Sequence, residues 1–84
     1  MNQLNLKFFA SIREAVGHGS EAYATQATTL GALRAELVAR GAGYADSLAP
    51  SQAVRMAINQ TLSDASATLP SQAEVAFFPP VTGG

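Results

Sequence analysis

The sequence predicts an α+β domain in which one main helix lies across a mixed sheet of four to five strands. Two patterns support this prediction. Several short segments alternate apolar and polar residues, as half-buried strands do, and one longer segment repeats its apolar residues with helical spacing. Their order along the chain is two strands, the main helix, and then two or three strands, which is typical of an α+β fold. At 84 residues, with 48% hydrophobic and 13% charged, the chain is expected to form one globular domain.

The first strand is expected at residues 3–9, where every second residue from Leu4 to Phe8 is apolar. A short helix should follow, because Ser11 with Glu14 three residues later matches a capping box. This helix is expected to stop at the first glycine of the chain, since glycine is favoured just after a helix.

The main helix comes after a second, weaker strand at residues 21–25. Thr28 or Thr29 is expected to cap its beginning, and the helix should run to about Arg40 and stop at Gly41. Its apolar face is formed by Leu30, Leu33, Leu37 and Val38.

The second half of the chain is predicted to complete the sheet. Residues 41–50 are expected to form a loop or a short helical turn, with Tyr44 and Leu48 over the edge of the core. The remaining elements are a third strand at 54–58, a turn at Asn59 and Gln60, a short pairing segment at Thr61 and Leu62, a turn at 70–73 and a last strand at 74–78.

The last residues carry the strongest functional signal. Pro79 and Pro80 follow the last strand, offer no N–H to a neighbouring strand and hold the backbone near polyproline geometry. The six residues that begin there would reach about 20 Å if extended. Gly83–Gly84 carries no side chains, so such a terminus fits a narrow passage into another protein's active site. We therefore expect a domain at residues 1–78 and an extended, flexible tail at 79–84.

Composition argues against several functional classes. The chain has no cysteine, so it offers no disulfide, thiolate nucleophile or cysteine metal site. The net charge is −1 and the basic residues are scattered, so no nucleic-acid partner is expected. His18, the single histidine, lies between two glycines and is expected to be solvated rather than a ligand or base. No membrane span or signal peptide is recognisable, and we expect a cytoplasmic protein that binds no metal and is not a free-standing enzyme.

Three segments resemble the small, sulfur-carrying subunit of molybdopterin synthase, which belongs to the ubiquitin-like β-grasp group. They are residues 6–14 (LKFFASIRE), 57–62 (AINQTL) and 74–84 (EVAFFPPVTGG). The last segment is the most specific, since thiamine-pathway carriers also end in Gly-Gly but usually without Phe-Phe-Pro-Pro. The sequence departs from the family at 71–74, which lacks the usual Asp-Gly-Asp type of turn. The resemblance covers essentially the whole chain and implies a β-grasp fold.

The resemblance also implies a mechanism for the terminal glycine. A partner enzyme that uses ATP would adenylate the Gly84 carboxylate, and a sulfur donor protein would convert the adenylate to a thiocarboxylate. The tail would then enter the large catalytic subunit and give its sulfur to the pterin precursor of the molybdenum cofactor. In this interpretation the chain binds no cofactor by itself, is not catalytic alone, and serves as the sulfur-donating subunit of the complex.

Partner binding is expected to involve two exposed aromatic residues. Phe9 and Phe78 fall on the faces opposite the expected core positions of their strands. In the family, the positions that match Phe9, Leu62 and Phe78 form a hydrophobic docking patch, and Arg13 lies beside it. The residues alone leave open that these side chains only cover the sheet. The tail residues expected to contact partners are Pro79, Pro80, Val81 and Thr82.

Two alternative functions stay open. The chain could be a sulfur carrier of another pathway, such as that of the thiamine thiazole. It could instead be a ubiquitin-like protein modifier or interaction module, whose tail is joined to lysines or simply packs. The Phe-Phe-Pro-Pro approach to Gly-Gly favours the molybdopterin synthase carrier over both.

Overall fold

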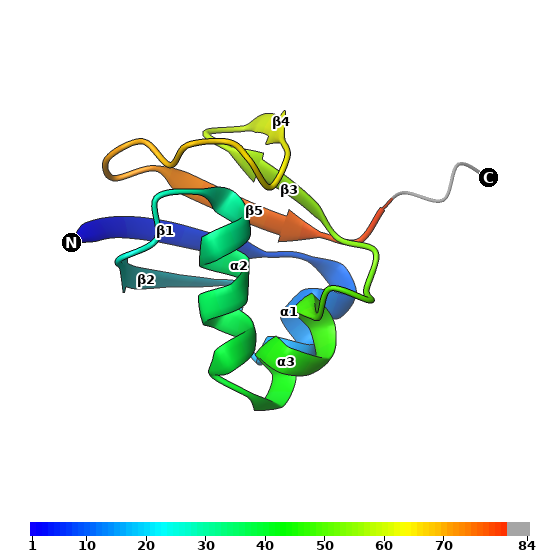
Figure 1. Ribbon diagram of the computed structural model, residues 1–84. Coiled ribbons are helices and arrows are strands. Elements are labelled where there is room, and N and C mark those ends of the chain that lie inside the picture. Colours follow the sequence, from blue (N-terminus) through cyan, green and yellow to red (C-terminus); the bar gives the residue numbers. More distant parts are fainter. Residues whose placement is uncertain (81–84) are drawn as a thin grey trace.

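The computed structural model describes residues 1–80, within which five strands and three helices form two layers (Figure 1). The sheet has the order β2-β1-β5-β3-β4; β1 and β5 are parallel, and the other neighbours are antiparallel. The predicted α+β class and mixed sheet are therefore confirmed. In chain order the elements are β1 (Asn2–Phe8), α1 (Ala10–Val16), β2 (Ser20–Thr25), α2 (Leu30–Ala39), α3 (Ala42–Leu48), β3 (Arg55–Ile58), β4 (Thr61–Ser63) and β5 (Glu74–Phe78).

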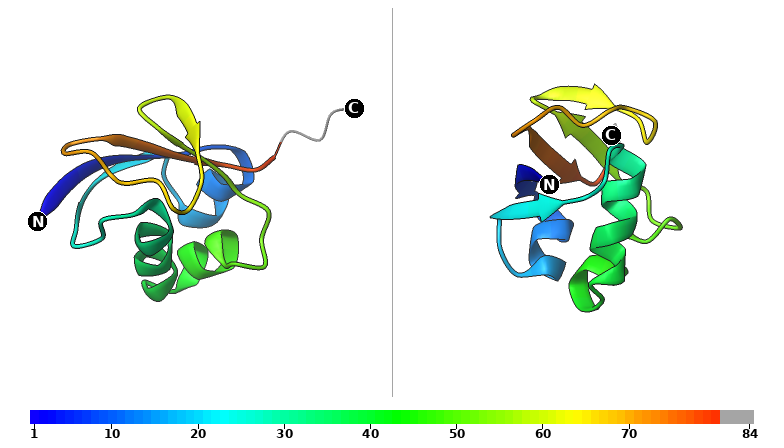
Figure 2. Two further views of the ribbon diagram at one scale, coloured as in Figure 1. Left: turned by 45° about the horizontal axis from the view of Figure 1, so that its top comes forward. Right: turned by 60° about the vertical axis from the view of Figure 1, so that its left-hand side comes forward.

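The three helices lie on one face of the sheet, and none of them covers the opposite face (Figures 1 and 2). We call the uncovered side the outer face. Among residues 1–80, no helix is long and apolar enough to cross a membrane. The predicted tail residues Val81, Thr82, Gly83 and Gly84 lie outside the described residues.

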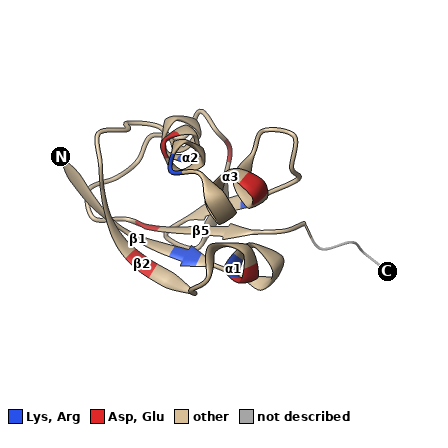
Figure 3. Cartoon of the chain, turned by 90° about the horizontal axis from the view of Figure 1, so that it is seen from below, with Lys and Arg blue, Asp and Glu red and all other residues tan. Residues whose placement is uncertain are grey.

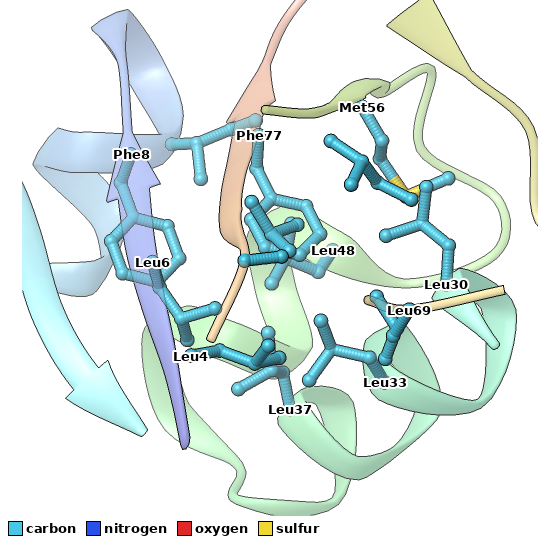
Figure 4. Packing of buried hydrophobic residues seen from close by; sticks show 14 residues of the cluster. Leu4, Leu6, Phe8, Leu30, Leu33, Leu37, Leu48, Met56, Leu69 and Phe77 are labelled. Carbon is cyan, nitrogen blue, oxygen red and sulfur yellow. The ribbon is translucent and has the colours of Figure 1, made fainter. Parts of the chain in front are cut away.

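The core lies between the sheet and the helices (Figure 4). The pleat turns alternate residues of β1 and β5 inward, so Phe8 and Phe77 meet with ring centroids 5.8 Å apart in a stacked arrangement. From the helix layer, α2 contributes Leu30, Leu33 and Leu37, all fully buried. Each large apolar side chain buried in this way stabilises the fold by roughly 1.5–3 kcal/mol. The core therefore holds the central strand β5 and its neighbour β1 in a fixed position relative to α2.

Cap and turn residues behave as the sequence predicts at three places in the chain. Gly17 has φ of +99° and ends α1. Thr29 caps α2, and its hydroxyl oxygen accepts a hydrogen bond of 3.2 Å from the Ala32 N–H. Asn59 and Gln60 both have positive φ, as the type I′ form of a two-residue hairpin turn between β3 and β4 requires.

The predicted capping box of α1 is wrong. The helix begins at Ala10, so Ser11 lies inside it, and the capping residue is Phe9, whose side chain makes no capping hydrogen bond. The cause is tertiary, because the Phe9 N–H donates to the Phe77 carbonyl at 3.1 Å and keeps the backbone extended as far as Phe9. The segment expected to be a loop or short helical turn contains the seven-residue helix α3.

Candidate partner-binding surface

Apolar side chains from four strands of the sheet and their ends gather on the outer face. Ala76 of β5 is in register with Ala57 of β3, which is in turn in register with Leu62 of β4. Phe78 lies two residues beyond Ala76, and Phe9 directly follows β1. The Phe9 and Phe78 rings meet edge to face, with centroids 6.4 Å apart. We call these five residues the outer patch.

The outer patch exposes much of its apolar area to solvent. Phe9 is 50% exposed and Leu62 is 62% exposed, while Phe78 is half-buried. Ala57 and Ala76 lie between them and are nearly buried, because their short side chains do not reach past their larger neighbours. Exposed apolar residues grouped on one face are typical of sites where another molecule binds, so the outer patch is a candidate docking surface. The structure thus brings together three residues that the sequence analysis singled out, Phe9, Leu62 and Phe78.

Arg13 lies on α1, one helical turn after Phe9. Its backbone N–H donates to the Phe9 carbonyl at 3.3 Å, and its exposed guanidinium lies against Gly19. The arginine is therefore close to the Phe9 end of the outer patch, but it belongs to the helix layer rather than to the outer face of the sheet.

Pro79 and Pro80 continue from β5 and are both half-buried. Pro79 lines a hollow of about 240 Å³, together with side chains of α1 and α3 that include Ile12 and Ser47. This position gives the end of the chain a fixed starting point beside Phe78, at the edge of the outer patch. The other predicted tail residues follow, beyond the part of the chain that the structure describes.

A polar cluster that the sequence analysis missed lies between the sheet and the helix layer and surrounds Glu21 of β2. Its carboxylate accepts hydrogen bonds from the Tyr44 hydroxyl, from Arg40 at 2.9 Å and, with the ring nitrogen protonated, from His18 at 2.8 Å. Burial raises the pKa of Glu21, but these hydrogen bonds outweigh it and leave the pKa below its ordinary value. Burial and the neighbouring Glu21 raise the pKa of Tyr44 to about 12.

This cluster joins α3 to β2. It stabilises the packing of the helices on the sheet and is not part of the outer patch. The His18 side chain is 42% exposed but bonded, not simply solvated as expected. The short spacing between His18 and Glu21 was the local signal in the sequence for this cluster. Tyr44 belongs to α3 and contacts both residues only through tertiary packing. Within residues 1–80, no group of three or more histidine or acidic side chains could hold a metal ion.

Comparison with known proteins finds sequences that resemble this chain over nearly its whole length. A family model described as the ThiS family matches residues 6–84. The molybdopterin synthase sulfur carrier subunit of Escherichia coli (strain K12) is 40% identical over 81 residues, which cover 96% of this chain and 99% of that protein.

Solved structures share the fold. The HVO 2177 protein of Haloferax volcanii has a TM-score of 0.78 at 32% identity, over 99% of this chain and 87% of that one. A putative molybdopterin converting factor, subunit 1, from Pyrococcus furiosus has a TM-score of 0.78 at 20% identity, over 96% of this chain and all of that one. At 20% identity, the similarity to the Pyrococcus furiosus protein supports a shared fold alone.

Proposed function

This chain belongs to the ThiS family, and we propose that it is the sulfur carrier subunit of a molybdopterin synthase. The observation that carries the proposal is the 40% identity to a protein of that name over nearly the full length of both chains. The outer patch supports the proposal. A carrier whose terminus reacts in the active sites of larger proteins needs a surface to which those proteins bind. The Phe-Phe-Pro-Pro-Val-Thr-Gly-Gly ending supports the molybdopterin pathway over the thiamine pathway.

The chemistry proposed for Gly84 divides a difficult sulfur transfer into easier steps. An adenylating partner joins the carboxylate to AMP and releases pyrophosphate from ATP, which makes the carbonyl carbon electrophilic. A sulfur donor protein then delivers sulfur at the sulfide oxidation level, which attacks that carbon and displaces AMP, so that a thiocarboxylate remains. The thiocarboxylate sulfur then attacks a carbon of the pterin precursor and displaces an oxygen leaving group from it, which forms a thioester. Hydrolysis of this thioester leaves the sulfur on the pterin and returns Gly84 to the carboxylate. The chain itself binds no cofactor in this scheme, because the adenylating partner holds the ATP.

We assign the outer patch to docking of the large catalytic subunit and, in turn, of the adenylating enzyme. Phe78 belongs to the patch and directly precedes Pro79 and Pro80, so a partner that covers the patch is next to the start of the tail. The prolines restrict the backbone at this point, which lowers the entropy lost when the tail is held in an active site. Gly83 and Gly84 lack side chains and suit the narrow end of such a passage.

The experiment that tests the proposal blocks the terminal glycine. A short tag fused after Gly84, or deletion of Gly84, is expected to abolish sulfur transfer in the reconstituted synthase and to leave the melting temperature unchanged. The same tag placed before Met1 is the matched control and should leave transfer intact. Normal transfer by the C-terminally tagged protein would contradict the proposal.

A mass measurement then identifies the modification. After incubation with ATP, the adenylating enzyme and a sulfur donor, the peptide that contains Gly84 should show replacement of one oxygen by sulfur. Oxidation of Met1 or Met56 gives a nominally similar gain in mass, so the change must be located within the C-terminal peptide.

Genetic complementation tests the choice of pathway. The gene is expected to rescue a strain that lacks the carrier of molybdenum cofactor synthesis, and not one that lacks the thiamine carrier. A ladder of covalent conjugates that depends on Gly84 would instead indicate a protein modifier.

A further inference from the structure

The hollow beside Pro79 lies where the chain leaves the folded domain. Its volume is about 240 Å³, and its walls come from α1, α3, the segment before β3 and Pro79 itself. The helices lie on one face of the sheet, whereas Phe78, directly before Pro79, belongs to the outer patch on the other face (Figure 2). We call this space the tail-root hollow. The tail therefore starts between the outer patch on one side and the tail-root hollow on the other.

The tail-root hollow combines apolar walls with a single charge. Two serines and a glutamine supply uncharged polar groups, and its apolar side chains are Ile12, Ala15, Ala53 and Pro79. Within residues 1–80, Asp46 is the one charged residue that lines it. Asp46 is exposed and is the only charged position of α3, on the side of the molecule where β5 ends (Figure 3). The hollow is thus a largely apolar site with a carboxylate at its rim.

Two arginines lie on neighbouring helices, and neither lines the tail-root hollow. On α1, Arg13 places its guanidinium against Gly19, just before β2. On α2, Arg34 donates to three backbone carbonyls at and after the end of α3, and it lines a different hollow along α2. Carbonyls at the end of a helix carry partial negative charge, so they already offset the charge of Arg34.

The other basic residues are also engaged or placed elsewhere. Arg40 pairs with Glu21 at 2.9 Å, and Arg55 lines a separate hollow together with Asp64. The single lysine of the chain belongs to β1. Within residues 1–80, the ion pairs are those of Glu21, so none of them includes Asp46. The charge at the rim of the tail-root hollow is therefore not neutralised by another described side chain.

We propose that the protein which receives the tail inserts a lysine or arginine side chain into the tail-root hollow and pairs it with Asp46. The inference rests on the proposed function, which supplies the partner. A protein that takes the tail into its active site must surround the backbone at Pro79, so it covers this hollow as well as the outer patch. Only 80 residues precede the tail's described end, and Pro79 is already half-buried there, which fixes the hollow beside the path that the partner encloses.

The chemistry of the hollow selects a basic side chain over the alternatives. The methylene stem of lysine or arginine packs against apolar walls while its charged end stays at a polar rim. Covering the hollow removes water from Asp46, and a cation on the partner offsets the cost of this desolvation. A neutral apolar side chain would fill the same walls but leave the carboxylate without a partner, and an acidic side chain would be repelled by it.

The charge is tested with two variants that raise the net charge by one. Asp46→Asn removes the carboxylate, while Gln26→Lys adds a cation at an exposed position after β2, at the opposite end of the sheet. Calorimetric titration of the purified large synthase subunit measures Kd at low and high salt. Asp46→Asn should raise Kd roughly three- to tenfold at low salt, and less at high salt. Gln26→Lys should stay within about twofold of wild type.

Entry into the hollow is tested by filling it. Ala53→Leu places a larger side chain in the wall, and Ala39→Leu makes the same change at an exposed position of α2. Ala53→Leu should raise Kd roughly fivefold or more, because the inserted side chain then has no room, and Ala39→Leu should leave Kd unchanged. Thermal melting of each variant verifies that it is folded.

Each outcome decides for or against the inference. A Kd for Asp46→Asn within twofold of wild type, an equal loss of affinity in Gln26→Lys, or an unchanged Kd for Ala53→Leu would overturn it. In each of these cases, binding of the wild-type chain would still support the proposed function. Failure of the wild-type chain to bind the large subunit would overturn both.

Discussion

Truncation of Phe9 provides a direct test of the outer patch as a docking surface. A phenylalanine buries about 150–250 Å² when it is fully covered. Phe9 is 50% exposed in the free chain, so roughly 100 Å² of its surface is left for a partner to cover. At about 25 cal/mol per Å², that area corresponds to roughly 2.5 kcal/mol, of which an alanine methyl group retains a part. We therefore expect Phe9→Ala to weaken binding of the large subunit by about 2 kcal/mol, or roughly 30-fold in Kd.

The folded state should tolerate this change. The backbone hydrogen bonds of Phe9 with Phe77, Ile12 and Arg13 do not involve its side chain, and the substitution chiefly removes the edge-to-face packing of its ring against Phe78. The free energy of unfolding should fall by only about 1 kcal/mol.

Calorimetric titration of the large subunit measures Kd, and thermal melting reports the stability of each variant. Gln3→Ala is the matched control, because Gln3 is exposed on the same face of β1 at the opposite end of the strand. A Kd for Phe9→Ala within threefold of wild type, or an equal loss of affinity in Gln3→Ala, would refute the reasoning.

Two further predictions concern the stability of the fold. A Cβ atom at Gly43 of α3 would lie 1.8 Å from the carbonyl oxygen of Ala15 in α1, so Gly43→Ala must separate the two helices. It should lower the free energy of unfolding by about 2–3 kcal/mol in urea denaturation, and an unchanged midpoint would contradict the close packing. The hydrogen bonds around Glu21 predict how the free energy of unfolding depends on pH. The pKa of Glu21 is lowered in the folded chain, so its contribution to stability is present above its ordinary value of 4.5 and is lost as the pH falls below it. The raised pKa of Tyr44 acts in the opposite direction, so its contribution is present below pH 10 and is lost as the pH rises towards about 12. Glu21→Gln should reduce the acid-side loss of stability and Tyr44→Phe the alkaline-side loss; urea midpoints that follow the wild-type pH profile would argue against both.

Local sequence patterns determined the elements whose signals lie within a few residues of each other. The alternation of apolar and polar residues determined which side chains of β1 and β5 face the core. It therefore predicted that Phe9 and Phe78 would point away from the core. Thr29 set the start of α2, because a hydroxyl oxygen at that position accepts a hydrogen bond from the N–H three residues later.

Tertiary structure decided the features that depend on distant segments. The beginning of α1 follows from the pairing of Phe9 with Phe77, which overrides the local match of Ser11 and Glu14 to a capping box. The outer patch arises in the same way. Phe9, Leu62 and Phe78 are distant from one another in the sequence, and they share one face of the sheet only because β1 and β3 pair with opposite edges of β5 and β4 pairs with β3. Strand order and register are set by the packing of the whole core, so they govern which surface side chains become neighbours, and no short segment of the sequence contains that information.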